Sequence, residues 1–225
     1  MTDALNLYGD KKKVLSQGRG SDIASQRIDD LDRAALRHSI EQPSGITILD
    51  LGCGFPVNPT RHALLGHHVL AVDTYDFSRE FGEISAALKL ENITFLNQSL
   101  QEALSNWHRQ KVDLVYSQRT IHYVHPVEMV EAISRLFEVV EAGGAVFVSA
   151  SGLGSELGEN YPGADMPWEQ RFAPLSEDMQ KKHGIEGDVC LYTEADLVSL
   201  CESAGFSARK IYSSPFGNVK ASFHR

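Results

Sequence analysis

Two glycines and two acids in the first half of the chain have the spacing of a nucleoside-binding site. Gly52 and Gly54 follow an apolar run that contains Asp50, and Asp73 ends the next apolar run. Glycines let the backbone turn sharply and leave room for a ligand to lie against it. An acid at the end of the second strand can accept hydrogen bonds from both ribose hydroxyls. The stretch therefore predicts a site for an adenosine-containing ligand.

Two details of this turn indicate what else the ligand carries. Asp50 precedes the first glycine by two residues, and a carboxylate there would repel a diphosphate and attract an ammonium group. Pro56 stands where dinucleotide-binding loops have their third glycine. We therefore expect an adenosine that bears a cationic amine and no diphosphate. A nicotinamide-dependent oxidoreductase is the alternative that these two details disfavour.

A second group of reactive side chains follows the fourth predicted strand, in the stretch SQRTIHYVH. Arg119, His122 and Tyr123 are the candidate catalytic residues. Histidine has an ordinary pKa suited to a general base, and packing beneath the next helix is its alternative role. Arg119 could bind an acidic group of the substrate or pair with a neighbouring carboxylate of the protein.

The elements that must position these residues alternate between strand and helix. Such alternation, with near-continuous apolar strands, predicts a doubly wound α/β fold around a mostly parallel sheet. A closing pair of strands at the C-terminus reads as an antiparallel edge. The predicted strands are 46–51, 68–73, 92–97, 112–117, 145–151, 207–214 and 218–225, and the predicted helices are 59–65, 78–90, 100–108, 126–140 and 193–205.

The chain divides into two predicted parts. Residues 1–44 form an N-terminal lid that includes an amphipathic helix over 22–40, and residues 45–225 form the core. Within the core, residues 152–191 lack periodicity, and long irregular stretches inside a domain are commonly functional. We expect this stretch to be an insertion that faces the substrate. We also expect the lid to bring Arg19 to a carboxylate of the ligand.

Composition narrows the class of protein. The net charge of −9 disfavours a nucleic-acid partner, which needs a basic face. No apolar run reaches the roughly 18 to 20 residues of a membrane span, and the N-terminus lacks the apolar region of a secretory signal. Three separated cysteines favour a reducing cytoplasm. The histidines fit no metal-ligand spacing, so no metal is expected.

Taken together, these motifs resemble class I S-adenosylmethionine-dependent methyltransferases. The resemblance lies in ILDLGCG…HHVLAVD, in NITFLNQSL, in the stretch from VDLVYSQRT to EAGGAVFVS, and in LYTEADLVSLCESAGFSARKI. It implies a Rossmann-like, seven-stranded sheet with an antiparallel last strand. It places Asp50 at the methionine amine, Asp73 at the ribose, and Gln98 and Ser99 at the adenine. The full set of expected cofactor contacts is Asp50, Gly52, Cys53, Gly54, Asp73, Gln98, Ser99, Leu100, Ser117 and Gln118, with Arg19 from the lid.

The implied activity is methyl transfer to a small-molecule acceptor by in-line displacement, which leaves S-adenosylhomocysteine. The protein is expected to act as a monomer or homodimer. A methyltransferase of tRNA or protein remains an alternative, as does a non-catalytic S-adenosylmethionine-binding regulator. An amino-methylating DNA enzyme is disfavoured, because SQRT stands where an Asp/Asn-Pro-Pro-aromatic tetrapeptide is expected.

Overall fold

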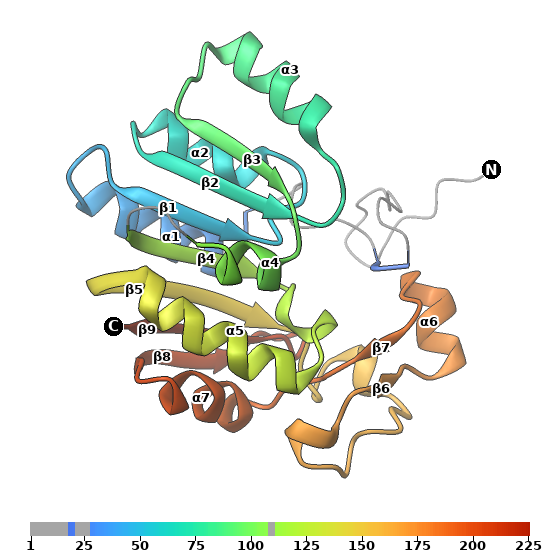
Figure 1. Ribbon diagram of the computed structural model, residues 1–225. Helices are drawn as coiled ribbons and strands as arrows, with labels where there is room; N and C mark the ends of the chain where they lie inside the picture. Colours follow the sequence, from blue (N-terminus) through green and yellow to red (C-terminus); the bar gives the residue numbers. More distant parts are fainter. Residues whose placement is uncertain (1–17, 21–27, 108–110) are drawn as a thin grey trace.

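A computed structural model describes residues 18–20, 28–107 and 111–225. Its centre is a seven-stranded sheet in the order β3-β2-β1-β4-β5-β9-β8 (Figure 1). The first five strands pair in parallel, and β9 pairs antiparallel with both neighbours. The predicted Rossmann-like sheet with an antiparallel last strand is confirmed. The strands are β1 (Thr47–Leu51), β2 (His68–Asp73), β3 (Ile93–Asn97), β4 (Val112–Gln118), β5 (Val140–Ala150), β8 (Ser207–Ser213) and β9 (Val219–His224).

Helices cover both faces of the sheet, as the apolar strands require. One face carries α1 (Asp30–Glu41), α2 (Val57–Leu64) and α3 (Ser78–Leu88), and the other carries α4 (Leu100–Ser105), α5 (Pro126–Val139) and α7 (Glu194–Ser203). Successive strand residues point to opposite faces. Ile48 accordingly packs in one core cluster with Leu31 of α1, whereas Leu49 packs in the other.

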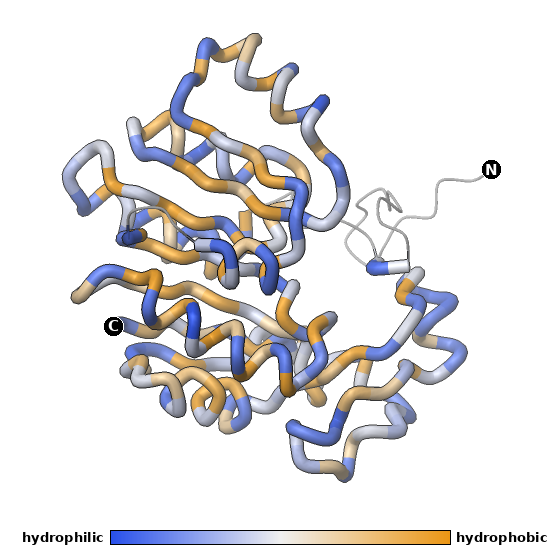
Figure 2. Tube along the Cα trace, viewed as in Figure 1, coloured by the Kyte–Doolittle hydropathy of each residue, from blue (hydrophilic) through white to orange (hydrophobic). Residues whose placement is uncertain are grey.

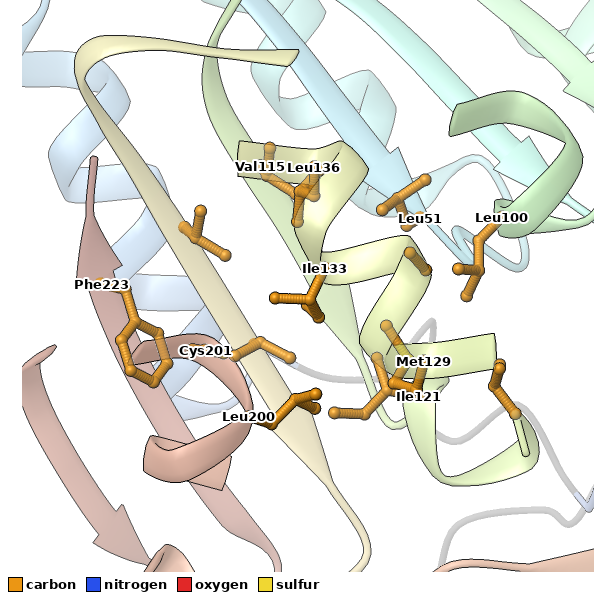
Figure 3. Packing of buried hydrophobic residues seen from close by; sticks show 14 of the residues in the cluster. Leu51, Leu100, Val115, Ile121, Met129, Ile133, Leu136, Leu200, Cys201 and Phe223 are labelled. Atoms are coloured by element: carbon orange, nitrogen blue, oxygen red, sulfur yellow. The ribbon is translucent and has the colours of Figure 1, made fainter. Parts of the chain in front are cut away.

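The larger core lies between the sheet and α4, α5 and α7. Figure 3 shows side chains from β1, β4 and β9 meeting those of the three helices, among them Leu51, Val115, Ile133, Leu200 and Phe223. Figure 2 shows the central strands as largely hydrophobic. This packing holds the carboxyl ends of β1 and β4 at a fixed place.

Three element boundaries differ from the predictions. The helix expected over 22–40 is described only from Asp30, where Asp29 forms a capping box with Asp32; residues 21–27 lie outside the described part of the chain. The helix α2 begins at Val57, ahead of Pro59, since proline is tolerated in a first turn. The run EAGG does not end α5 but lies within β5, whose pairing with β4 begins at Val140.

The stretch 152–191 forms a small subdomain with its own apolar core. It contains η3 (Glu156–Gly158), η4 (Trp168–Gln170), β6 (Ala173–Pro174), α6 (Glu177–His183) and β7 (Asp188–Val189). The buried guanidinium of Arg171 fastens it to α7 by donating to Asp196 Oδ2 at 2.6 Å, and it also donates to the Leu191 carbonyl at 2.8 Å within the stretch. Trp168 packs into the main core, so this aromatic residue anchors the subdomain.

A buried histidine pair joins α1 to α2. His62 Nδ1 lies 3.1 Å from Ser39 Oγ, and His67 Nε2 lies 3.1 Å from the Ser39 carbonyl. Burial, with smaller effects from the nearby His67 and Arg61, lowers the pKa of His62 to about 4. His62 is therefore neutral at pH 7 and resists protonation as the pH falls.

This pair predicts a loss of stability in acid. The unfolded chain binds a proton on His62 near pH 6.5 while the folded chain resists it, so the contribution of His62 falls as the pH drops from about 6.5 to about 4. We expect this loss in the free energy of unfolding to reach about 2 to 3 kcal/mol. Urea unfolding of the wild type and of His62→Asn, at pH 7 and pH 4.5, measures it as the difference between the two proteins. If the difference in stability between the two proteins is the same at both pH values, His62 is not the source of the acid sensitivity.

Among the described residues, no helix has both the length and the apolar character to cross a membrane. In the same part of the chain, no three histidine, cysteine, aspartate or glutamate side chains gather in a group that could hold a metal ion.

Candidate functional site

The glycine turn after β1 is pinned to both neighbouring strands. The amides of Gly52 and Cys53 donate to the Val72 carbonyl at 2.8 and 3.0 Å. Gly52 has φ +70°, and a Cβ on it would lie 2.1 Å from Thr120 Oγ1, which follows β4. Glycine is therefore required at this position both for its conformation and for the close approach of Thr120. The turn lies where β1 separates β2 from β4, at the carboxyl edge of the sheet.

The carboxylate of Asp73 is held against this turn. Gly54 N donates to Asp73 Oδ2 and Tyr75 N donates to Asp73 Oδ1, each at 2.9 Å. Asp73 is partly exposed, and Cys53 and Gly54 beside it are also partly exposed. The predicted turn and the predicted acid thus meet in space, with the carboxylate fixed by backbone donors.

Asp50 lies deeper, on the side of β1 that faces α2. Its side chain is buried, and Asn58 Nδ2 donates to Asp50 Oδ2 at 2.9 Å. Burial raises the pKa of Asp50 to about 7, and the negative charges of Asp32 and Asp73 add to the rise while Asn58 opposes it. A buried acid that is half protonated near neutral pH is poised to ionise when a cation arrives.

The residues that follow β3 lie beside Asp73, at the end of β2. Gln98 N donates to the Asp73 carbonyl at 3.0 Å, and the Gln98 side chain is exposed. The hydroxyl of Ser99 is engaged in the capping box of α4 with Glu102. Leu100 is buried in the main core. Of the two residues expected at the adenine, Gln98 has the side chain more available to a ligand.

The last residues of β4 point to opposite faces of the sheet. Ser117 Oγ donates to the Leu51 carbonyl at 2.9 Å and ties β4 to β1. Gln118 Nε2 donates to Asp29 Oδ2 at 2.6 Å beneath α1, and the buried ammonium of Lys220 donates to the same oxygen at 2.6 Å. Sequence reasoning missed Asp29 and Lys220, because they are 191 residues apart and no local pattern links them.

The loop after β4 carries the candidate catalytic residues. Arg119 has φ +52°, and its amide donates to the Ser149 carbonyl and to Ser149 Oγ, both at 3.0 Å. His122 is buried, with Nε2 3.3 Å from Ser151 Oγ. Burial, with a smaller effect from Arg119, lowers the pKa of His122 to about 3. A buried imidazole of such low basicity suits holding the end of β5 better than accepting a proton.

Residues 18–20 form a strap, Gly18–Arg19–Gly20, that crosses the carboxyl edge of the sheet. Gly20 N donates to the Gly184 carbonyl at 2.9 Å, and Glu186 N donates to the Gly18 carbonyl at 2.6 Å. Figure 1 shows this strap beside α6 and beyond the ends of β1 and β2.

The strap also meets the loops after β2 and β4. Tyr123 Oη donates to the Arg19 carbonyl at 2.7 Å, and Arg19 Nη1 donates to Thr74 Oγ1, also at 2.7 Å. Arg19 therefore reaches the residue next to Asp73. The strap connects the subdomain, Tyr123 and the acid that ends β2.

Residues 48–144, which include the turn, Asp73 and the loop after β4, match a family model described as a methyltransferase domain. The matched segment runs from β1 into β5. No curated protein matches the chain in sequence. The glycine turn, Asp73 and β2 to β4 lie within this segment, and the strap 18–20 lies outside it.

Solved structures support the methyltransferase fold over most of the chain. The 1,6-didemethyltoxoflavin-N1-methyltransferase of Burkholderia thailandensis, with bound 1,6-didemethyltoxoflavin and S-adenosylhomocysteine, is 17% identical with a TM-score of 0.67, over 91% of this chain and 79% of that one. The magnesium protoporphyrin IX methyltransferase of Synechocystis PCC 6803, with bound S-adenosylhomocysteine, is 18% identical with a TM-score of 0.62, over 89% and 82%. The N-methyltransferase NodS of Bradyrhizobium japonicum WM9 is 13% identical with a TM-score of 0.57, over 91% and 98%. These likenesses establish the fold.

Proposed function

We propose that this methyltransferase domain transfers the methyl group of S-adenosylmethionine to a small-molecule acceptor. The observation that carries the proposal is the pair of acids around the glycine turn. Asp73 is fixed beside the turn by Gly54 N, and Asp50 is buried behind it. One carboxylate suits a ribose diol and the other an ammonium group, and an adenosine that carries an amino acid has both groups.

The remaining cofactor contacts follow from this placement. Gly52, Cys53 and Gly54 pack against the amino-acid part, and Ser117 and Gln118 line it from β4. Gln98, Ser99 and Leu100 border the adenine. Arg19 donates to Thr74, next to the ribose acid, and we place it at the methionine carboxylate. S-adenosylhomocysteine, the product, occupies the same contacts.

The reaction needs alignment more than activation, because the sulfonium is already a good leaving group. The acceptor donates an electron pair to the methyl carbon, the S–CH₃ bond breaks, and its electron pair remains on sulfur. Holding three atoms in line supplies much of the rate. Arg119 and Tyr123 position the acceptor from the loop after β4, and His122 holds that loop against Ser151. An acceptor that carries a proton loses it to solvent or to a neighbouring base.

Several features support a small acceptor over tRNA or protein. The chain has a net charge of −9, and the strap and the subdomain 152–191 are joined across the carboxyl edge of the sheet. A covered edge suits a compact acceptor better than a polymer.

The cysteines Cys53, Cys190 and Cys201 are free, as expected for a cytoplasmic protein. We propose that the protein acts there as a monomer or homodimer.

Calorimetry followed by labelled transfer tests this function. We expect S-adenosylmethionine and S-adenosylhomocysteine to bind and NAD not to bind. Incubation with methyl-labelled cofactor and a fractionated lysate should then yield a labelled small molecule, identified by mass spectrometry. Binding of NAD alone would overturn the proposal. Cofactor binding without any labelled product would instead favour a regulator, and label on tRNA or protein would favour a polymer acceptor.

Asp50 predicts that cofactor affinity depends on pH. Its pKa is about 7, and the cofactor's ammonium group binds its ionised form, so a proton must leave before binding below pH 7. We expect the affinity for S-adenosylhomocysteine to fall by up to about tenfold per pH unit below 7. Calorimetry from pH 5.5 to 7.5 measures the slope. Asp50→Asn should lose both affinity and slope, and a slope retained in that variant would refute the role of Asp50.

A further inference from the structure

The guanidinium of Arg119 has no ion-pair or hydrogen-bond partner among the residues that the structure describes. In the described part of the chain, the buried cations Arg171 and Lys220 pair with carboxylates: Arg171 with Asp196, and Lys220 with Asp29 and Asp30. Arg119 is itself partly buried, in a chain with 30 acidic and 21 basic residues. An unpaired arginine in such a place is available to a ligand.

The backbone at Arg119 is held in a conformation that arginine rarely adopts. Its φ of +52° lies in the left-handed region, which disfavours residues with a Cβ. Two bonds from its amide to Ser149 keep it there. Strained positions of this kind concentrate where a side chain must be aimed. Arg119 directly follows Gln118, so it stands at the end of β4 beside the proposed methionine contacts.

The charge of Arg119 acts on Tyr123, which lies in the same loop. Burial raises the pKa of Tyr123 to about 12, and the positive charges of Arg119 and Arg19 oppose that rise. Both arginines are therefore close to the Tyr123 hydroxyl. An unpaired guanidinium beside a sulfonium cofactor is electrostatically unfavourable unless an anion lies near both charges. The acceptor is the ligand that can supply this anion without being part of the cofactor.

We propose that Arg119 binds a carboxylate or phosphate group of the methyl acceptor, so that the substrates of this enzyme are small anions. This inference rests on the proposed methyl transfer and adds the class of acceptor. The planar fork of arginine binds either oxyanion through two parallel hydrogen bonds. Arg19, on the β2 side at Thr74, remains available for the carboxylate of the cofactor.

The test compares Arg119→Gln and Arg119→Lys with the wild type. Arg209→Gln is the matched control, since it removes the same charge from an exposed position on β8. Small molecules from a lysate are divided by anion exchange into a retained and an unretained fraction, and each is incubated with methyl-labelled S-adenosylmethionine. Binding of S-adenosylhomocysteine is measured separately by calorimetry.

We expect the wild type and Arg209→Gln to label a product from the retained fraction. Arg119→Gln should lower the initial rate at limiting acceptor by about 30-fold or more, which corresponds to the loss of a charge-assisted pair. Raising the concentration of the fraction should restore much of the rate, because the loss lies in acceptor binding. Arg119→Lys should retain part of the activity, and S-adenosylhomocysteine should bind all four proteins within about twofold of one another.

Three results would overturn the inference and leave methyl transfer intact. The first is label only in the unretained fraction, and the second is an unchanged rate in Arg119→Gln. The third is weaker binding of S-adenosylhomocysteine to Arg119→Gln with unchanged binding of 5′-methylthioadenosine, which lacks the amino-acid part; Arg119 would then hold the cofactor's carboxylate. Failure of the wild type to bind S-adenosylhomocysteine would overturn the proposed function itself.

Discussion

Replacing Arg171 with methionine is expected to lower the free energy of unfolding by about 3 to 5 kcal/mol, because it breaks a buried ion pair from one side. The guanidinium is buried, and it serves Asp196, the Leu191 carbonyl and the Met166 carbonyl at once. Its removal leaves the Asp196 carboxylate in a site that is only 15% exposed. Urea unfolding followed by circular dichroism measures the loss.

A surface ion pair of the same chemistry provides the control. Arg135 pairs with Glu138 at 3.2 Å, and both side chains are more than half exposed. Arg135→Met should change stability little, since exposed pairs contribute little. The double variant Arg171→Met with Asp196→Asn should recover part of the loss, because it no longer buries a lone charge. Equal effects of Arg171→Met and Arg135→Met would refute the anchoring role of Arg171.

Replacing Asp73 with alanine is expected to weaken S-adenosylmethionine binding by about 1 to 3 kcal/mol, or roughly 5- to 150-fold. The ribose hydroxyls lose their charge-assisted acceptor. The same carboxylate accepts from Gly54 N and Tyr75 N, so its loss also loosens the turn against which the cofactor packs. Calorimetry at pH 7.5, where Asp50 is largely ionised, isolates this effect from the titration of Asp50.

Asp76 offers a control within the same loop. It is fully exposed and accepts a hydrogen bond from Ser78 N at 2.9 Å. Asp76→Ala removes an equal charge three residues further on and should leave cofactor affinity within about twofold. An Asp73→Ala protein that binds S-adenosylmethionine as the wild type does would show that the ribose lies elsewhere.

Local pattern was sufficient to predict most of the scaffold. The strands β1 to β5 are contiguous apolar runs separated by turn residues, and such runs specify strands wherever both faces are buried. The capping box at Thr193 and Asp196 and the proline in the first turn of α5 are likewise encoded in adjacent residues. The run EAGG was placed wrongly, because it lies between Val140 and Ala145, which pair with β4, and this pairing cannot be seen locally.

The site itself was predictable in part. The meeting of Gly54 with Asp73 follows from the order of the strands, since the ends of adjacent parallel strands share one edge. Asn58, which donates to Asp50, was also predictable, because it follows Asp50 by eight residues and lies in the first turn of the next helix. The role of Thr120 over Gly52 depends on a contact between residues 68 positions apart, and no local signal indicates it.

The sequence alone determined the order of strands and helices, the glycine turn and the two acids, because these depend on residues close together in the chain. The tertiary structure decided which side chains are buried, paired or left open. It buried His122, which lowers the pKa of that imidazole to about 3, and it paired Lys220 with Asp29. It also left Arg119 without a carboxylate among the described residues. Burial and pairing depend on segments that meet only when the chain folds, and they set the charge and the reach of every group in the site.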